Sequence, residues 1–196
     1  MNAQVLAAVG FALGFYGVTA YAVTRTARLT GASPVIIFRT GTAEEKASVV
    51  LMWIFPLVVV AAGLLPDRAL TRPLFDAPTL RVVGMLGLAA GLWLHVVALR
   101  TLGAAFQIGV DPSKTPGIVR TGPYRLVRHP VYAAFLIYFL GTWLLIPNVL
   151  FSIVAPLAAM RIYLQTRYEE AALLRRFGPE YAEYMRSTAR FIPGVF

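Results

Sequence analysis

Long apolar runs separated by short polar segments dominate the pattern along this chain of 196 residues. A bilayer-spanning helix needs about 20 mostly apolar residues. Five runs reach or approach that length: residues 5–23, 47–65, 80–99, 132–146 and 149–165. Only Pro147 and Asn148 separate the last two runs, so these should form a tight helical hairpin. The pattern therefore predicts an all-α fold, an integral membrane helical bundle of about five transmembrane helices followed by C-terminal helices.

The composition agrees with a membrane protein. Hydrophobic residues make up 58% and charged residues 14% of the chain, whereas a soluble domain carries about 25% charged residues. Such a chain cannot cover a water-soluble globule with polar surface, and the same figures exclude disordered, collagen-like and coiled-coil proteins. No basic residue precedes the long run 5–23, so we expect this run to be a helix of the bundle and not a signal peptide.

The basic residues indicate how the chain is oriented in the membrane. Lys and Arg together number 18 against nine Asp and Glu, which gives a net charge of +9. In a membrane protein this excess points to anionic lipid as the partner, and not to nucleic acid. Basic residues are concentrated in loops 24–46 and 100–131 and in the tail after residue 166. The positive-inside rule then predicts the N-terminus outside, with loop 100–131 and the tail in the cytoplasm.

Several kinds of site are not supported by the sequence. The chain has no cysteine, and its two histidines and scattered acids form no metal-ligand pattern, so no metal site is predicted. Glycine-rich nucleotide-binding motifs and the Gly-x-Ser-x-Gly motif are also missing from the sequence. His95 lies within an apolar run and is expected to be a packed or hydrogen-bonded core residue. Small-residue pairs in the first and third runs favour packing within a monomer, and dimerisation is the alternative.

The first polar motif reads GIVRTGPYRLVRHPVY from residue 117. Its Gly-Pro pair predicts a turn, and Pro130 suits the first turn of the following helix. His129 would then lie at a helix N-terminus, a position that favours anions, and Tyr132 would share its face. His129 and the arginine before it can hold a carboxylate. The alternative is a basic loop that contacts lipid phosphates.

The second polar motif continues the last apolar run. Arg161, Gln165 and Glu169 recur every four residues, so they form one polar stripe on a helix, whereas Arg167 and Glu170 lie on other faces. The structural alternative is a helix at the membrane surface with intrahelical salt bridges. Two adjacent acids beside an otherwise basic surface are unusual in such a helix.

In this order, the motifs resemble the isoprenylcysteine carboxyl methyltransferase family. The matching residues are Gly122-Pro123-Tyr124-x-x-x-Arg128-His129-Pro130-x-Tyr132, then a helical hairpin, then Arg167-x-Glu169-Glu170-x-x-Leu173-x-x-x-Phe177-Gly178-x-x-Tyr181-x-x-Tyr184, and finally Arg190-x-x-Pro193. The resemblance covers about the last hundred residues, and the first three runs match by topology alone. It implies a single membrane domain over residues 1–196, with three N-terminal spans in 1–99. Residues 100–196 would then hold the cofactor-binding loop, the hairpin and the C-terminal tail.

The resemblance also implies a cofactor, S-adenosylmethionine, which is released as S-adenosylhomocysteine. It would bind on the cytoplasmic face between loop and tail. The backbone of Ile118 and Val119 would face the adenine, and the two adjacent glutamates would reach the amino group or the ribose. The residues that the resemblance assigns to cofactor binding are Ile118, Val119, Tyr124, His129, Tyr132, Glu169 and Glu170.

The catalytic residues implied by the resemblance are Arg167, Glu169 and Arg161. Arg167 would lie near the methyl-accepting group. Eukaryotic members carry an arginine at the position that corresponds to Gln165 here, so both Arg161 and Arg167 are candidates for orienting the acceptor.

The expected function is that of an S-adenosylmethionine-dependent methyltransferase acting on a lipophilic small molecule. Carboxyl O-methylation of a prenylcysteine-like acceptor is the best-known reaction of the family, and lipid amines, thiols and isoprenoid acids stay open. One alternative is a membrane NADPH-dependent reductase of the sterol-reductase type, against which the paired glutamates argue. The other is a non-enzymatic membrane scaffold or transporter subunit. The lack of charges within the first two runs weakens the transporter version.

Overall fold

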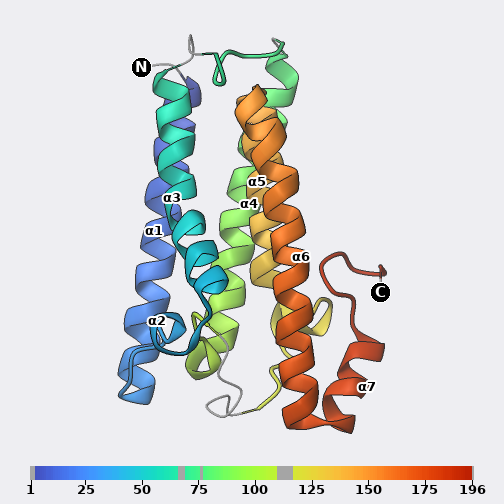
Figure 1. The fold of residues 1–196 in the computed structure, drawn as a ribbon. Coiled ribbons are helices and arrows are strands. Elements are labelled where there is room, and N and C mark those ends of the chain that lie inside the picture. The colour runs from blue at the N-terminus through green and yellow to red at the C-terminus, as the bar shows by residue number, and fades with distance from the viewer. Residues whose placement is uncertain (1–2, 66–68, 76, 110–116, 196) are drawn as a thin grey trace.

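The computed structural model describes residues 3–65, 69–75, 77–109 and 117–195, and these form helices joined by loops, with no β-strand among them. The chain order of the helices is α1 (Ala3–Thr30), α2 (Ile37–Thr40), α3 (Ala43–Leu64), α4 (Pro78–Leu102), η1 (Gly103–Ala105), η3 (Gly122–Arg125), α5 (Pro130–Leu145), α6 (Val149–Phe177) and α7 (Pro179–Ser187). The five long helices run side by side, and α2 and α7 lie at the same end of the bundle (Figure 1).

The prediction of an all-α membrane bundle is confirmed. In the part of the chain that the structure describes, four helices, α1, α3, α4 and α6, are long and apolar enough to cross a bilayer. The run predicted as the fourth span is the shorter apolar helix α5, which has 16 residues. Its length is set by Pro130 at its first turn and by the turn at Pro147 after its end. The expected five spans are therefore four long helices and one short one.

The predicted hairpin between α5 and α6 is present. The Asn148 side chain caps α6 by accepting a hydrogen bond from the Phe151 N–H at 2.9 Å. The helix then continues for 29 residues, well beyond the apolar run. It ends at Gly178, whose φ of +53° suits glycine and reverses the chain into α7.

Glycines allow α4 and α5 to pack closely. A Cβ on Gly84 of α4 would lie 2.6 Å from the Gly141 carbonyl oxygen, and a Cβ on Gly91 would lie 2.7 Å from the Tyr138 ring. In α1, Gly14 contacts Leu92, whereas a Cβ on Gly10 would meet nothing within 4 Å. The glycines therefore serve packing within the chain, most strongly between α4 and α5.

His95 is a hydrogen-bonded core residue, as expected from its apolar run. Its Nδ1 lies 3.0 Å from the Tyr138 hydroxyl, and both side chains are buried. The rings of Phe15 and Phe135 lie beside it, at centroid distances of 5.8 and 5.2 Å. This aromatic cluster ties α1, α4 and α5 together beneath the polar end of the bundle.

The loop before α2 supports the polar end. The Ile108 carbonyl accepts hydrogen bonds from the N–H groups of Ile36 and Ile37 at 3.1 and 2.9 Å, and its own N–H donates to the Pro34 carbonyl at 2.9 Å. These bonds hold the segment after η1 in place, next to the cavity described below.

Candidate functional site

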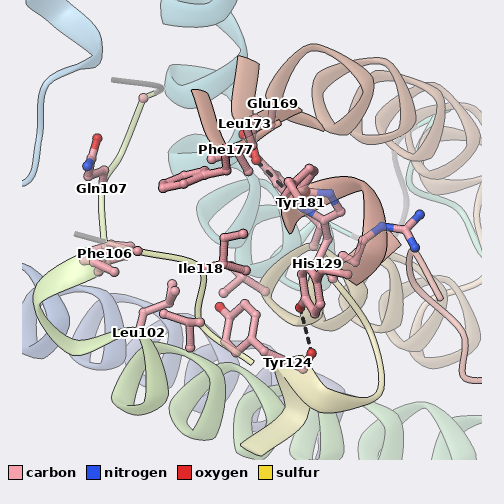
Figure 2. Close-up of a pocket in the computed structure, with 18 residues that line it drawn as sticks. Leu102, Phe106, Gln107, Ile118, Tyr124, His129, Glu169, Leu173, Phe177 and Tyr181 are labelled. Atoms are coloured by element: carbon pink, nitrogen blue, oxygen red, sulfur yellow. Dashed lines mark hydrogen bonds and ion pairs between the residues drawn. The ribbon is translucent and has the colours of Figure 1, made fainter. Parts of the chain in front are cut away.

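A cavity of about 220 Å³ lies at the end of the bundle where η1, η3 and α7 gather. Figure 2 shows Leu102, Phe106 and Gln107 on one side, facing His129 and Tyr181 on the other, with Ile118 between them. The walls come from the end of α4 and the segment after it, residues 117–119, η3, the start of α5, the end of α6 and α7. The loop and the tail predicted to enclose the cofactor therefore do share one cavity.

Most residues predicted to bind the cofactor line this cavity. They are Ile118, Val119, Tyr124, His129, Tyr132 and Glu169. Glu170 is not among the lining residues. The arginine candidates Arg161 and Arg167 are also outside the lining. The structure thus brings together six of the seven predicted cofactor residues and separates the arginines from them.

Glu169 links α5 to the polar stripe of α6. Its Oε1 accepts a hydrogen bond from the Tyr132 hydroxyl at 2.5 Å and one from the Gln165 Nε2 at 3.3 Å. Its Oε2 lies 3.8 Å from Nδ1 of His129. Glu169 therefore presents its carboxylate at the cavity wall, held between a tyrosine and a histidine that also line it.

Glu170 occupies a different environment from its neighbour. Its side chain is only 4% exposed. Nε of Arg128 donates to its Oε1 at 2.9 Å, Nε2 of His129 lies 3.2 Å from the same oxygen, and Nη2 of Arg190 donates to its Oε2 at 2.5 Å. The residue predicted to reach the cofactor thus binds two arginines and a histidine, because a buried carboxylate requires polar partners.

The α7 side of the cavity is fixed by a tyrosine. The Tyr184 hydroxyl donates to the backbone carbonyl of Tyr124 at 2.7 Å, which joins α7 to η3. Burial raises the pKa of Tyr184 to about 12 and that of Tyr124 well above its usual value, so both hydroxyls stay protonated. Outside this contact, Arg120 pairs with Glu180 at 3.1 Å.

The two arginine candidates lie in different surroundings. Arg161 is half-buried, and its Nε donates to the Ser48 Oγ of α3 at 2.7 Å. This bond places Arg161 beside α3. Arg167 is exposed and has no hydrogen-bond or ion-pair partner among the described residues.

Some lining residues were not predicted from the sequence. Leu102, Ala105, Phe106 and Gln107 come from the end of α4, from η1 and from the segment after it, a region without any recognisable motif. Leu173, Phe177, Tyr181 and Tyr184 belong to the tail motif but had no assigned role. These four residues recur every three or four positions, and this helical spacing was the signal in the sequence that they share one face. Among the described residues, no three His, Cys, Asp or Glu side chains gather into a metal site.

Comparison with known proteins places this arrangement in a family. Residues 79–180 match the family model described as phospholipid methyltransferase. The matched residues run from the start of α4 to the start of α7 and include most of the cavity lining.

Individual relatives agree with this match. The chain is 33% identical over 115 residues to protein-S-isoprenylcysteine O-methyltransferase A of Arabidopsis thaliana, covering 57% of this chain and 58% of the relative. It is 30% identical over 143 residues to the cobalt-zinc-cadmium resistance protein CzcN of Cupriavidus metallidurans, covering 72% of this chain and 62% of the relative. The corresponding values for protein-S-isoprenylcysteine O-methyltransferase of Saccharomyces cerevisiae are 29% over 140 residues, covering 70% and 59%.

The chain thus spans less than two thirds of the length of each of these relatives. The family model, in contrast, matches just over half of this chain, across the elements that build the cavity. This integral membrane protein belongs to the phospholipid methyltransferase family.

Proposed function

We propose that the protein transfers the methyl group of S-adenosylmethionine to a lipophilic acceptor. The observation that carries this proposal is the cavity, in which the two polar motifs meet at one end of a membrane bundle. Membership of the methyltransferase family and the names of the relatives in Arabidopsis and yeast support the same reaction. The excess of basic residues in the loops at this end favours a cytoplasmic cavity.

The cavity lining suits the proposed cofactor. Apolar side chains such as Leu102, Phe106 and Ile118 offer contacts to an adenine, next to the backbone of residues 117–119. Glu169 and His129 provide charged and polar groups for the ammonium and carboxylate of the methionine end. We propose that Tyr124 and Tyr132 complete this wall.

When bound, S-adenosylmethionine supplies an electrophilic methyl group on a sulfonium sulfur. The protein must hold the acceptor atom in line with that methyl group, about 3–3.5 Å from it. A carboxylate acceptor carries no proton to be removed, so it requires an orienting cation but no general base. An amine or thiol acceptor would require a base, and Glu169 is the carboxylate at the cavity wall.

We propose that Arg161 orients an acceptor carboxylate. The bond to Ser48 uses Nε and leaves its two terminal nitrogens without a partner among the described residues. Those nitrogens are the pair that grips a carboxylate at two points. Neither arginine lines the cavity, but Arg167 is exposed whereas Arg161 is half-buried and held by Ser48, so the role of Arg167 in this proposal is secondary.

The acceptor class that fits best is a prenylated cysteine or another lipophilic carboxylic acid. Its tail would stay among the membrane helices while its head group reaches Arg161. The binding measurement compares S-adenosylhomocysteine with NADPH on the purified protein. Methyl transfer is then followed from labelled S-adenosylmethionine to a farnesylated cysteine with a free carboxylate, to its amide, and to phosphatidylethanolamine. We expect binding of S-adenosylhomocysteine alone, and a base-labile methyl ester on the free acid only.

The outcomes separate the alternatives. Transfer of label to phosphatidylethanolamine would show that the acceptor is an amine and not a carboxylate. Binding of NADPH without S-adenosylhomocysteine would indicate a reductase, and binding of neither would favour a scaffold. Single-turnover transfer in Arg161→Ala and Arg167→Ala, with cofactor affinity as the control, decides between the arginines. We expect Arg161→Ala to lose turnover and Arg161→Lys to recover little of it.

A further inference from the structure

The segment after α7 folds back against the loop that carries His129. The N–H of Arg128 donates to the Ala189 carbonyl at 2.8 Å, and the N–H of His129 donates to the Arg190 carbonyl at 3.2 Å. In return, the N–H of Ala189 donates to the Leu126 carbonyl at 3.3 Å. Residues 188–191, which we call the strap, therefore pair with residues 126–129 through the backbone. The strap lies beyond the residues 79–180 that match the family model.

One side chain fastens the strap to α6. Arg190 donates from Nη2 to Glu170 Oε2 at 2.5 Å and from Nε to Oε1 at 3.2 Å. Its guanidinium also lies over the Tyr163 ring, 5.2 Å from the centroid. The hydrogen bonds to Glu170 raise the pKa of Arg190 further, so this cation is permanent. A two-point contact of this kind fixes both distance and orientation.

The strap reaches the cavity through His129. Glu170 binds Arg190 with both oxygens, and its Oε1 also lies 3.2 Å from Nε2 of His129. The strap contacts the same histidine again, because the Phe191 ring lies 6.2 Å from the imidazole centroid. His129 lines the cavity, whereas Glu170 and Arg190 do not. The His129 imidazole is thus held by two contacts, one with the Glu170 carboxylate and one with Phe191 of the strap.

We infer that Arg190 is a positioning residue: through Glu170 it holds the strap against His129 and so sets the imidazole that faces the cofactor. This inference depends on the proposed function in one respect only, namely that the ligand entering the cavity is S-adenosylmethionine. Arg190 touches neither cofactor nor acceptor. Glu170 has the same role here, in place of the direct cofactor contact expected from the sequence.

The variants to compare are Arg190→Ala, Arg190→Lys and Arg186→Ala. Arg186 is the matched control, because it is an exposed arginine four residues earlier, on α7, with no ion pair among the described residues. We expect Arg190→Ala to weaken binding of S-adenosylhomocysteine about tenfold per folded molecule, and to raise KM for S-adenosylmethionine while KM for the acceptor stays constant. Arg190→Lys should recover part of the loss, since it keeps the charge but not the two-point contact. Arg186→Ala should match the wild type.

A spectroscopic measurement tests the inference independently of activity. The chain has only two histidines, so ¹⁵N-histidine labelling gives two imidazoles, assigned with His95→Gln. In Arg190→Ala and Arg190→Lys the His129 resonances should move while those of His95 stay. Unchanged His129 resonances in Arg190→Lys would overturn the inference, even if Arg190→Ala does not fold. Wild-type affinity for S-adenosylhomocysteine in a folded Arg190→Ala variant would also overturn it. A wild-type protein that binds no S-adenosylhomocysteine would instead reject the proposed function, and the resonances would still report on the strap.

Discussion

Two adjacent glutamates illustrate how single residues acquire different roles at this site. Consecutive residues of a helix point about 100° apart, since one turn takes 3.6 residues. Glu169 faces the cavity and contacts Tyr132, whereas Glu170 faces inward and binds Arg128, His129 and Arg190. The sequence places the two carboxylates on different faces of one helix, but it assigns both of them to the cofactor. Their difference comes from the rotation of α6 about its axis, which tertiary packing determines.

His129→Ala should weaken binding of S-adenosylhomocysteine ten- to a hundredfold. The variant removes a polar contact at the cavity wall, and a charge-assisted hydrogen bond contributes about 1.5–3 kcal/mol. Titration calorimetry of the purified protein measures the change. Arg175→Ala, an exposed arginine on α6, serves as the control and should bind like the wild type. Equal affinity in His129→Ala would remove the histidine from the cofactor site.

The variant Glu169→Gln tests whether Glu169 only contacts the cofactor or also acts as the general base. If the acceptor is a carboxylate, the variant should lose about tenfold in cofactor affinity, yet keep its turnover at saturating cofactor within about tenfold, because no proton is removed. If the acceptor is an amine, turnover itself should fall by about 10²–10⁴-fold. Single-turnover kinetics with saturating S-adenosylmethionine separates the two cases.

The elements followed closely from the apolar pattern, while their contacts did not. The hairpin at Pro147 and Asn148 and the break at Gly178 were readable, because proline and glycine determine the backbone locally. The contribution of Leu102 and Phe106 to the cavity was not readable, because it depends on how the segment after α4 folds back. Likewise, Arg190 was part of a recognisable motif, but only the folded strap shows that it reaches Glu170.

The α4–α5 contact should be sensitive to a single methyl group. In Gly84→Ala the new Cβ would meet backbone atoms of α5 at 2.6–2.7 Å, so the helices must separate, and overpacking of this kind costs about 1–3 kcal/mol. Gly10→Ala is the matched control, because a Cβ there meets nothing within 4 Å, and it should stabilise α1 slightly. Thermal unfolding in detergent compares the two variants. A lower melting temperature for Gly10→Ala than for Gly84→Ala would contradict this packing.

At the scale of the whole molecule, the loop charges predict the topology. A reporter fused after Phe196 should report a cytoplasmic location, and one inserted between Pro147 and Asn148 should report an external one. Figure 1 shows α7 and the α5–α6 turn at opposite ends of the bundle, so the two reporters must disagree. Reversed signals would separate the cavity from the compartment that holds the cofactor and would exclude the proposed reaction.

Because helix α5 is short, the thickness of the bilayer should affect how a lipophilic acceptor reaches the cavity. Its 16 residues measure about 24 Å, less than the hydrocarbon core of about 30 Å. Because the hairpin joins the far end of α5 to the start of α6, we expect the shortfall at the Pro130 end, beside His129 and the cavity. Hydrophobic mismatch of this kind is met by local thinning of the membrane. In a thin bilayer the lipid head groups would therefore lie close to the cavity. In a thick bilayer they would lie farther from it. In vesicles of increasing acyl-chain length, KM for a lipophilic acceptor should rise, while affinity for S-adenosylhomocysteine, which arrives through water, should stay constant.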